Sequence, residues 1–435
     1  MSTTPLRIIP RDSWVFLIIL TLIYSTSWID RSVLIILAEP IRKDLDLSDT
    51  QMGLLNGLAF SLVYSFAGVA VARLADKRSR KTIIAASASL FGLMTAICGF
   101  AQGFLVLVLA RMGVAVAESG VSPAAYSMMG DKIPHKGRGT AIAIYSLGIS
   151  IGTFIGLTGG GWIEARFDWR TAFVAMGLPG LALGLLFFVL VKEPERGALE
   201  EGGPAVDEPH QQMTFRKSLA FLAERPVFLA IAMGFAFLTF GHGAFEVWAP
   251  TYLMRVKGVD MEQVAVMSGL LQGAITIISS LAAALIADRL SVSDLRWYVW
   301  VPLVGTAMAV PAEWLFFVGG SDRPWLYYLV AELGIATTSA PLLTIGQMLL
   351  PPQFRAFGMS IMLLLLNLIG SGGGPSLVGA MSDLLRPLLG MDSLAAAILS
   401  AQVGTLAGVA FLWWASAKMS VGYAARTSAG PAGSA

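Results

Sequence analysis

Two adjacent charged residues lie inside the first long apolar stretch of this sequence. Asp30 and Arg31 are the only charges between Ser13 and Ala38, a run long enough to cross a bilayer as a helix. A charge at mid-membrane costs about 2.5–3.5 kcal/mol on insertion scales, so an ionisable residue there is a candidate functional site. Two interpretations are open. The pair either neutralises itself near a helix end, with Arg31 reaching the outer headgroups, or belongs to a buried cluster.

A second pair of charges, Arg111 and Glu118, lies in the apolar stretch 103–130. The two residues are two helical turns apart and therefore share one face of a helix. A buried carboxylate changes its affinity for a proton when its burial or its distance from an arginine changes. We therefore predict a proton-coupling cluster in the first half of the chain, made of Asp30, Arg31, Arg111 and Glu118. A static network that holds the two helices together is the alternative.

The second half of the chain carries fewer candidates. His242 and Glu246 are four residues apart and share a helix face, and neighbouring glycines and a proline favour a broken or bent helix beside a cavity. His242 taken alone is more typical of a hydrogen-bonded histidine in a helix bundle than of a proton carrier. Glu313 and Glu332 lie near the outer ends of their spans, and the sequence leaves open whether they sit in the outer interface or on a pathway.

The composition is that of an integral membrane protein. Hydrophobic residues make up 56% of the 435 residues and charged residues only 13%. Apolar runs of about 20 residues recur along the whole chain, which indicates several membrane spans. These runs are continuous, so they predict helices and exclude a barrel. The predicted fold class is therefore all-α.

Breaks between the apolar runs predict twelve transmembrane helices in two six-helix bundles. The expected spans are 13–38, 49–73, 81–101, 103–130, 138–163, 170–191, 226–254, 262–287, 296–318, 325–349, 355–381 and 393–417. The long polar segment after the sixth span reads as a linker. We expect an N-terminal bundle at 1–192, a cytoplasmic linker at 193–225, a C-terminal bundle at 226–420 and a disordered tail at 421–435.

Lysine and arginine are unevenly distributed across the predicted spans. With the N-terminus inside, most of the 30 Lys and Arg residues fall in the inner loops and tails. Because positive charge accumulates on the cytoplasmic side, both termini are expected to be cytoplasmic in a multi-pass protein of the cell membrane. The first apolar segment is too long for a signal peptide and lacks a cleavage site, so it is expected to be retained.

A short charged motif occurs once in each half. Ala72-Arg-Leu-Ala-Asp76-Lys follows the second span, and Ala284-Leu-Ile-Ala-Asp288-Arg follows the eighth. This repeat predicts two halves of parallel topology, the arrangement used for alternating access. A lone aspartate among cations in both halves suggests a cytoplasmic gate between them, made of Arg73, Asp76, Arg80, Asp288 and Arg289. Control of topology by positive charge is the alternative.

Few polar side chains are available to line a pathway. The candidates, scattered among 19 methionines and 23 phenylalanines, are Asn56, Tyr64, Tyr126, Tyr145, His242, Glu246, Gln272, Gln347 and Asn367. So little polar lining suits an amphipathic substrate better than a sugar, which needs many hydrogen bonds. A ladder of small residues, Gly148, Gly152 and Gly156, predicts close packing of the fifth span against a neighbouring helix.

Other functional classes find no support in the residues. Three scattered histidines and the single Cys98 supply no nucleophile, base or ligand set, so we predict no enzyme, no metal site and no disulfide. The chain has no Gly-x-x-x-x-Gly-Lys-Ser/Thr run for ATP. A net charge of +2 without a basic stripe predicts no nucleic-acid partner. We expect a monomer that needs no cofactor and draws on the proton gradient.

Several motifs together resemble the spinster-type transporters of the major facilitator superfamily. The loop 72–81 resembles the superfamily signature, with Ala72 and Ser79 where glycine is usual. Arg111-Met-Gly-Val-Ala-Val-Ala-Glu118-Ser is similar to the spinster stretch Arg-x-Gly-x-x-x-Gly-Glu-Ala. Ser27-Trp-Ile-Asp30-Arg31 is similar to Asn-Tyr-x-Asp-Arg. The match extends over 44–55, 169–173 and 177–180.

The resemblance implies a substrate class. Spinster-type proteins move sphingosine phosphate, lysophospholipids or related amphipathic lipids, so the implied function is proton-coupled transport of such lipids by alternating access. The matched residues would serve proton coupling or bind the substrate headgroup, and the departures at Ser27 and Trp28 stand beside that pocket. The alternative expectation is proton-coupled transport of small organic anions or hydrophobic drugs, attracted by Arg31 and Arg111.

Overall fold

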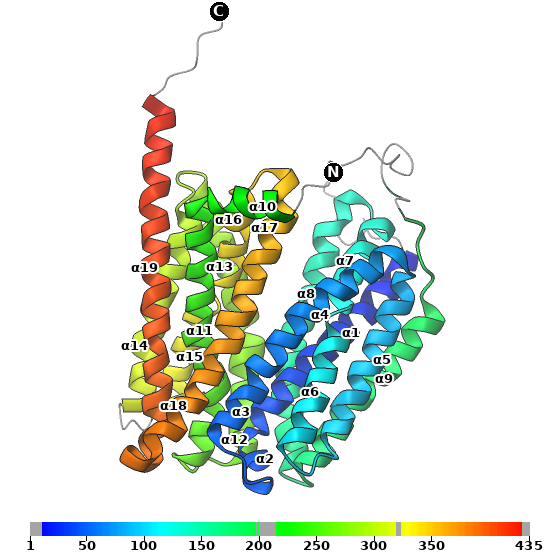
Figure 1. Ribbon diagram of the computed structural model, residues 1–435, viewed down its shortest axis with the longest axis vertical. Helices are drawn as coiled ribbons and strands as arrows, with labels where there is room; N and C mark the ends of the chain where they lie inside the picture. Colours follow the sequence, from blue (N-terminus) through cyan, green and yellow to red (C-terminus); the bar gives the residue numbers. More distant parts are fainter. Residues whose placement is uncertain (1–10, 197–198, 200–214, 319–322, 429–435) are drawn as a thin grey trace, which may run out of the picture.

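The computed structural model describes residues 11–196, 199, 215–318 and 323–428. Throughout this part of the chain the regular elements are helices. Figure 1 shows that they form two groups that lie side by side, α1 to α9 in one and α10 to α19 in the other. The all-α fold with two bundles is therefore confirmed.

The N-terminal half contains nine helical segments. They are α1 (Arg11–Ile36), α2 (Ala38–Asp44), α3 (Asp49–Asn56), α4 (Leu58–Lys77), α5 (Arg80–Cys98), α6 (Phe104–Glu118), α7 (Val121–Lys132), α8 (His135–Glu164) and α9 (Trp169–Leu190).

The C-terminal half begins with the short helix α10. Its segments are α10 (Phe215–Ala223), α11 (Pro226–Arg255), α12 (Met261–Ser268), η2 (Gly269–Ile275), α13 (Thr276–Ser291), α14 (Trp297–Val318), α15 (Pro324–Ile335), α16 (Ser339–Met348), α17 (Pro352–Leu365), η3 (Leu366–Gly373), α18 (Gly374–Leu389), η4 (Gly390–Asp392) and α19 (Ser393–Ser428). Two of these, η2 and η3, are π-helical, a form that is often found at functional sites.

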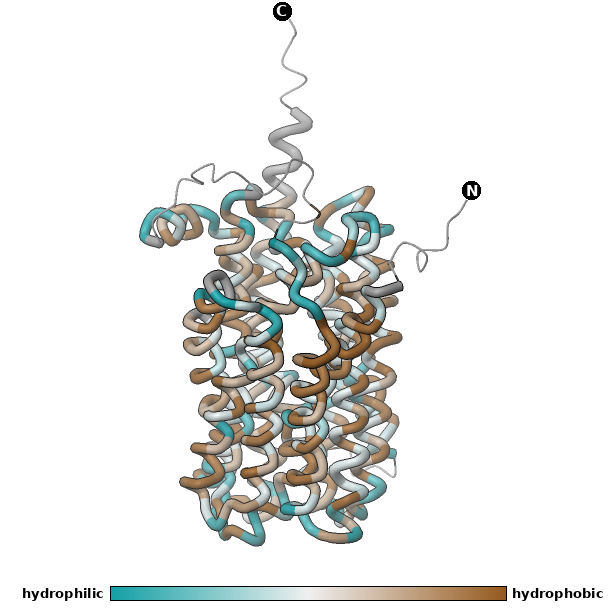
Figure 2. Tube along the Cα trace, turned by 90° about the vertical axis from the view of Figure 1, so that its right-hand side faces the viewer, coloured by the Kyte–Doolittle hydropathy of each residue, from teal (hydrophilic) through white to brown (hydrophobic). Residues whose placement is uncertain are grey.

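The helices are long and apolar enough to cross a bilayer. Ten stretches meet this condition, and the last of them, Gln353–Met419, contains two successive spans, α17 to α18 and then α19. Together α3 and α4 supply a further span, which gives the twelve that we predicted. Hydrophobic residues run along the middle of the bundle and hydrophilic residues gather at its two ends, as a bilayer requires (Figure 2).

Some spans depart from the single helices that the sequence suggested. The second span changes direction at Gly57, between α3 and α4, and the fourth is interrupted directly after Glu118, between α6 and α7. By contrast, α11 is one continuous helix through His242 and Glu246, so the expected break there is wrong. Its glycines serve packing instead, because a Cβ on Gly241 would lie 1.8 Å from the Thr405 hydroxyl of α19.

The small-residue ladder packs α8 against α1, as predicted. A Cβ on Gly148, Gly152 or Gly156 would lie 2.9, 2.3 or 2.8 Å from a backbone carbonyl oxygen of α1. Only glycine permits this approach, and the last contact is with Ile29, next to Asp30. The ladder therefore fixes the position of α1 at the predicted cluster.

The two halves meet at one side of the molecule. There α3 packs against α18, and α8 packs against α12 and η2. We call this side, where α2, α3, α12 and α18 lie, the far side; the start of α1 and α10 lie on the opposite, terminal side. Figure 1 shows the ribbons of the two halves close together on the far side and farther apart on the terminal side.

The predicted linker and tail fall partly on described residues. Helix α10 lies within 193–225, and α19 continues as far as Ser428, beyond the residue at which we ended the C-terminal bundle. Residues 197–198 and 200–214 of the linker and residues 429–435 of the tail lie outside the described residues.

Substitution of a ladder glycine tests the packing of α1. Gly152→Ala should lower the free energy of unfolding by about 1–3 kcal/mol, because its methyl group overlaps the Ser25 carbonyl. Gly139→Ala, on the same helix but with open space around it, should be neutral or stabilise by about 0.5–1 kcal/mol. Thermal unfolding in detergent measures both. Equal effects of the two substitutions would contradict the proposed role of the ladder.

Candidate functional site

Asp30 forms a buried ion pair with Arg111. The Arg111 guanidinium donates to the Asp30 carboxylate, and the Thr95 hydroxyl of α5 donates to the other carboxylate oxygen at 2.6 Å. Both charged side chains are 2% exposed. The pair thus joins three helices, α1, α5 and α6, and the idea that Asp30 is neutralised by its neighbour Arg31 is wrong.

Arg31 pairs with Glu118 instead of reaching the outer headgroups. Its Nη2 and Nε donate to the same carboxylate oxygen of Glu118 at 2.6 and 3.2 Å. Arg31 remains 24% exposed, whereas Glu118 is 5% exposed. The second oxygen of Glu118 is buried without a hydrogen-bond partner in the described part of the chain. The four predicted residues therefore come together as two ion pairs between α1 and α6.

Aromatic rings surround the two guanidinium groups. Phe60 of α4 lies 4.6 Å from the Arg31 guanidinium carbon and 5.2 Å from that of Arg111. The rings of Trp28 and Tyr64 lie 5.2 and 5.1 Å from Arg31. Such contacts favour a cation and hold it in an apolar setting. Arg31 therefore combines a charge, some exposure and an aromatic environment.

The helix break after Glu118 helps to place its carboxylate. Ser119 and Gly120 separate α6 from α7, and a Cβ on Gly120 would lie 2.6 Å from the Ser87 hydroxyl of α5. The break ends α6 at the residue that faces Arg31. A tyrosine cluster continues from there, in which Tyr24 stacks on Tyr145 at 4.3 Å and Tyr126 meets Tyr145 edge-on.

Four ionisable residues of the C-terminal half are also brought together. His242 Nδ1 lies 2.8 Å from Glu313, which in turn accepts a hydrogen bond from Gln402. Glu313 and Glu332 are both 0% exposed, so a location in the outer interface is wrong for them. Glu332 interacts electrostatically with Glu246 and Glu313. Their burial depends on helices that pack around them, which hydropathy along the chain does not report.

The predicted pathway residues fall in different surroundings. Tyr64 lies at Arg31, Tyr145 is fully buried, and Tyr126 is 46% exposed. Gln272, in the π-helical η2, donates to the Tyr328 hydroxyl and to the Glu246 carbonyl. The others are Asn56, bonded to a carbonyl of its own helix, Asn367, partly buried in η3, and Gln347, exposed near the end of α16.

The predicted cytoplasmic gate residues make contacts within their own halves. Arg80 pairs with Asp131 of α7 and with Glu193, and Asp288 accepts a hydrogen bond from Tyr298. Arg73 and Arg289 are exposed, and the side chain of Asp76 lies outside the described residues. The gate between the halves therefore stays a prediction.

Glu193 anchors the start of the predicted linker to the charged loop. It accepts hydrogen bonds from the Ser79 hydroxyl and from the backbone N–H groups of Arg80 and Lys81, at 2.5 to 3.0 Å. Burial would raise the pKa of this carboxyl, but these donors and the Arg80 side chain hold it below its ordinary value. Glu193 therefore caps α5 as an ionised group.

The main charged contact between the halves was not predicted. Arg255, at the end of α11, binds Asp49 through two hydrogen bonds of 2.8 Å and Glu39 through one of 2.8 Å. Asp383 of α18 accepts hydrogen bonds from the backbone of Asp49 and Thr50 at the start of α3. We call Glu39, Asp49, Arg255 and Asp383 the Arg255 network. Opposite charges at distant ends of predicted spans were the only signal for it in the sequence.

Glu39 of the Arg255 network is ionised over the neutral pH range. Burial would raise the pKa of Glu39, but the guanidinium groups of Arg42 and Arg255 outweigh it and hold the pKa below 4.5. Because the folded pKa is lowered, the contribution of Glu39 is fully present above its unfolded value and is lost only as the pH falls through the lowered value.

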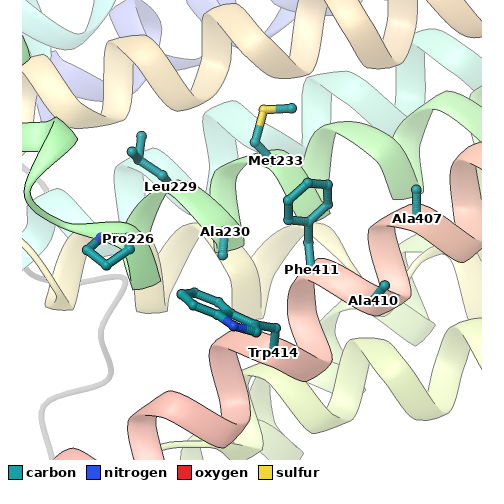
Figure 3. Close-up of a pocket in the computed structure, with 8 residues that line it drawn as sticks. All are labelled: Pro226, Leu229, Ala230, Met233, Ala407, Ala410, Phe411 and Trp414. Carbon is teal, nitrogen blue, oxygen red and sulfur yellow. The ribbon is translucent and has the colours of Figure 1, made fainter.

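An apolar pocket lies apart from these charged residues. It has a volume of about 550 Å³ and lies between α11 and α19 (Figure 3), lined by Pro226, Leu229, Ala230, Met233, Ala407, Ala410, Phe411 and Trp414. It contains none of the four ionisable residues of the N-terminal cluster.

Two six-helix bundles with ion pairs buried between their membrane helices are the architecture of a membrane transporter. The chain belongs to the major facilitator superfamily, because the family model of that name matches residues 20–375. The expectation that it is a transporter rather than an enzyme is therefore confirmed.

Comparisons with individual proteins confirm the resemblance to spinster transporters. An MFS-type efflux pump of Mycolicibacterium smegmatis is 33% identical over 94% of this chain and 94% of its own length. Protein spinster homolog 1 of Homo sapiens is 27% identical over 93% of this chain and 80% of its own length. The crystal structure of a bacterial homologue of the human lysosomal transporter Spinster, inward-facing and unoccupied, superposes with a TM-score of 0.84 at 27% identity, covering 94% of this chain and 98% of that one.

Removal of one charge from the Asp30–Arg111 pair should be costly. Asp30→Asn leaves a buried guanidinium without its counter-charge and should lower the free energy of unfolding by about 3–5 kcal/mol. Asp30→Asn combined with Arg111→Gln should recover part of that loss, because no charge is then left unpaired. Thermal unfolding of the single and double variants measures the difference. Additive losses would show that the pair is not coupled.

Loss of Arg255 should separate the halves on the far side. With spin labels at Phe167→Cys and Leu388→Cys, both exposed, Arg255→Gln should lengthen the distance between labels. The distances in the parent protein should stay constant from about pH 6 to 8, because Glu39 remains ionised there.

Arg166→Gln is the matched control for this measurement. It removes the exposed Arg166–Glu262 pair across the same interface, which is worth about 0–1 kcal/mol. The same distances in both variants would contradict the role given to Arg255.

Proposed function

We propose that this protein is a proton-coupled secondary active transporter that moves amphipathic lipids, lysophospholipid-like or sphingosine-phosphate-like, by alternating access. The observation that carries the proposal is Arg31. It is the one member of the N-terminal cluster with an appreciable exposed fraction, 24%, and its counter-ion Glu118 uses only one carboxylate oxygen.

Arg31 suits a phosphate-bearing headgroup. A guanidinium presents parallel N–H donors that match the spacing of two phosphate oxygens, and it keeps its charge at any physiological pH. The rings of Trp28, Phe60 and Tyr64 around it offer apolar surface to the part of the substrate next to the headgroup. The site therefore fits a molecule with an anionic end and an apolar body.

Competition for Arg31 supplies the coupling. When a substrate anion takes the guanidinium, Glu118 is left buried without its counter-charge. A buried carboxylate in that position binds a proton, since the charged form is the costly one. Release of the substrate returns Arg31 to Glu118 and expels the proton. Binding of the substrate to Arg31 is thus coupled to binding of a proton by Glu118.

The arrangement of the halves supports alternating access. They are joined on the far side by the Arg255 network and lie farther apart on the terminal side (Figure 1). With both termini cytoplasmic in a bacterial cell membrane, this arrangement corresponds to an inward-facing state. We propose that the proton gradient is the energy source, that no cofactor is needed, and that the monomer is the working unit.

A second candidate function is the export of hydrophobic drugs or small organic anions. It is favoured by one observation, the 33% identity to a protein named an efflux pump. The same Arg31 and the same aromatic rings would serve an organic anion, so the substrate itself must be varied in the test.

Transport in proteoliposomes tests the proposal. Labelled lysophospholipid and a labelled aromatic acid are offered under imposed pH gradients to the parent protein and to Glu118→Gln. We expect lysophospholipid flux that responds to the gradient in the parent, and flux that has lost most of this response in the variant.

Other outcomes have distinct meanings. Glu224→Gln, an exposed glutamate outside the membrane spans, should behave as the parent does. An unchanged pH response in Glu118→Gln would remove Glu118 as a proton carrier. Flux of the aromatic acid without any lysophospholipid flux would favour the second candidate.

A further inference from the structure

The C-terminal half holds a second group of ionisable side chains in its interior. His242 and Glu246 come from α11, Glu313 from α14 and Glu332 from α15. His242 is 2% exposed, the Glu313 and Glu332 side chains are 0% exposed, and Glu246 is partly buried. Glu332 interacts electrostatically with both Glu246 and Glu313, so the four groups form one cluster.

Hydrogen bonds determine the state of one member. The Thr405 hydroxyl donates to Gln402 Oε1 at 2.8 Å, which leaves the Gln402 amide N–H to donate to Glu313. His242 Nδ1 meets the other oxygen of Glu313 at 2.8 Å. With a proton on His242 Nδ1, Glu313 accepts at both oxygens, which is the role of a carboxylate, and a His242 cation would be its counter-ion.

Glu332 lacks the hydrogen-bond partners that Glu313 has among the described residues. Both of its carboxylate oxygens are buried without a hydrogen-bond partner among the described residues, and the same holds for His242 Nε2. On the helix of Glu332, Tyr328 lies one turn away, and its hydroxyl accepts a hydrogen bond from Gln272. The other ionisable groups around Glu332 are Glu313 of α14 and Glu246 of α11. An ionised Glu332 would therefore face other acidic groups in an apolar interior.

Positive charge does not reach this cluster from the packed helices. Among the helices that surround Glu332 and Glu313, α14, α15, α16 and η2 contain no Lys or Arg. Arg289, which follows Asp288 near the end of α13, and Lys418 of α19 are exposed. Arg255, at the end of α11, is bound to Asp49 and Glu39. Among the described side chains of these helices, His242 is the one group placed to offset one of the three carboxylates.

The two halves therefore treat charge differently. In the N-terminal cluster two arginines balance two carboxylates, and that cluster is neutral without any bound proton. The C-terminal cluster becomes neutral only when it holds three protons, either on its three carboxylates or on two of them and on His242 as a cation. In the described part of the chain, no three His, Cys, Asp or Glu side chains are placed to hold a metal ion, so protons are the cations that fit.

We propose that His242, Glu246, Glu313 and Glu332 form a second proton-binding site, with Glu332 as the group that stays protonated while the halves are joined on the far side. Glu246 is the member with exposed surface, so it is the route by which the proton of Glu332 exchanges. The site lies on α11, the helix whose end carries Arg255. Movement of α11 against the N-terminal half therefore changes the surroundings of the cluster.

The link to transport rests on the proposed function, whereas the binding of protons does not. Infrared spectroscopy of the purified protein tests proton binding without a substrate, because a protonated carboxylic acid has a carbonyl absorption that a carboxylate lacks. We expect such an absorption at neutral pH, and we expect Glu332→Gln to lose part of it. Glu246→Gln should slow its exchange in heavy water.

Glu224→Gln, an exposed glutamate of the same half, is the control and should leave the absorption unchanged. The absence of any protonated-carboxyl absorption in the parent protein at neutral pH would overturn the proposal without the need for a variant. So would an unchanged absorption in Glu332→Gln that elutes as a folded protein.

A second measurement tests the connection with the movement of the halves. The pH at which the Glu332 absorption disappears should differ between the parent protein and Arg255→Gln, because the latter separates the halves on the far side. An identical titration in the two proteins would overturn the link to movement and leave a proton that only stabilises the fold. Failure of lysophospholipid transport would overturn the proposed function and leave the infrared result intact.

Discussion

The cost of an uncompensated charge in an apolar interior governs this structure. Asp30 and Arg31 are adjacent in sequence, yet adjacent residues on a helix point in different directions, so each must find its partner on another helix. Both partners are on α6, two turns apart. The glycines of α8 that bring α1 into place, and the break that ends α6 at Glu118, are the packing features that make these distances possible. The contacts that pack α1 against α8 and end α6 at Glu118 therefore also place the charged side chains in their pairs.

The two halves share a topology but use different electrostatics. The N-terminal half compensates its carboxylates with arginines, which never lose their charge. The C-terminal half places a histidine and one amide donor at Glu313, while Glu332 is buried without a hydrogen-bond partner among the described residues. Between them, the Arg255 network joins the halves through the ion pairs of Arg255 with Glu39 and Asp49. A substrate anion and a proton therefore meet different kinds of group on the two sides of one molecule.

The fold and the N-terminal cluster could be predicted from the sequence because their signals are local. Long apolar runs report spans, and the spacing of Arg111 and Glu118 reports a shared helix face. The Arg255 network and the C-terminal cluster could not be predicted in this way. Glu39, Asp49 and Arg255 lie in the separate helices α2, α3 and α11, and the docking of the halves brings them together. The sequence left open whether Glu313 and Glu332 lie in the outer interface or on a pathway, because their position along a span does not reveal how many helices surround them.

Phe60 links the two ion pairs of the N-terminal cluster to the packing of the C-terminal half. Its ring covers the guanidinium groups of both Arg31 and Arg111. It stands near the start of α4, where the Leu58 N–H donates to Ser376 of the C-terminal half and where a Cβ on Gly57 would lie 2.4 Å from the Gly372 carbonyl oxygen. A shift of α18 and η3 would therefore move the start of α4 and tilt the Phe60 ring away from the two guanidinium groups. Water admitted beneath it would raise the local dielectric constant and weaken both ion pairs in a single motion.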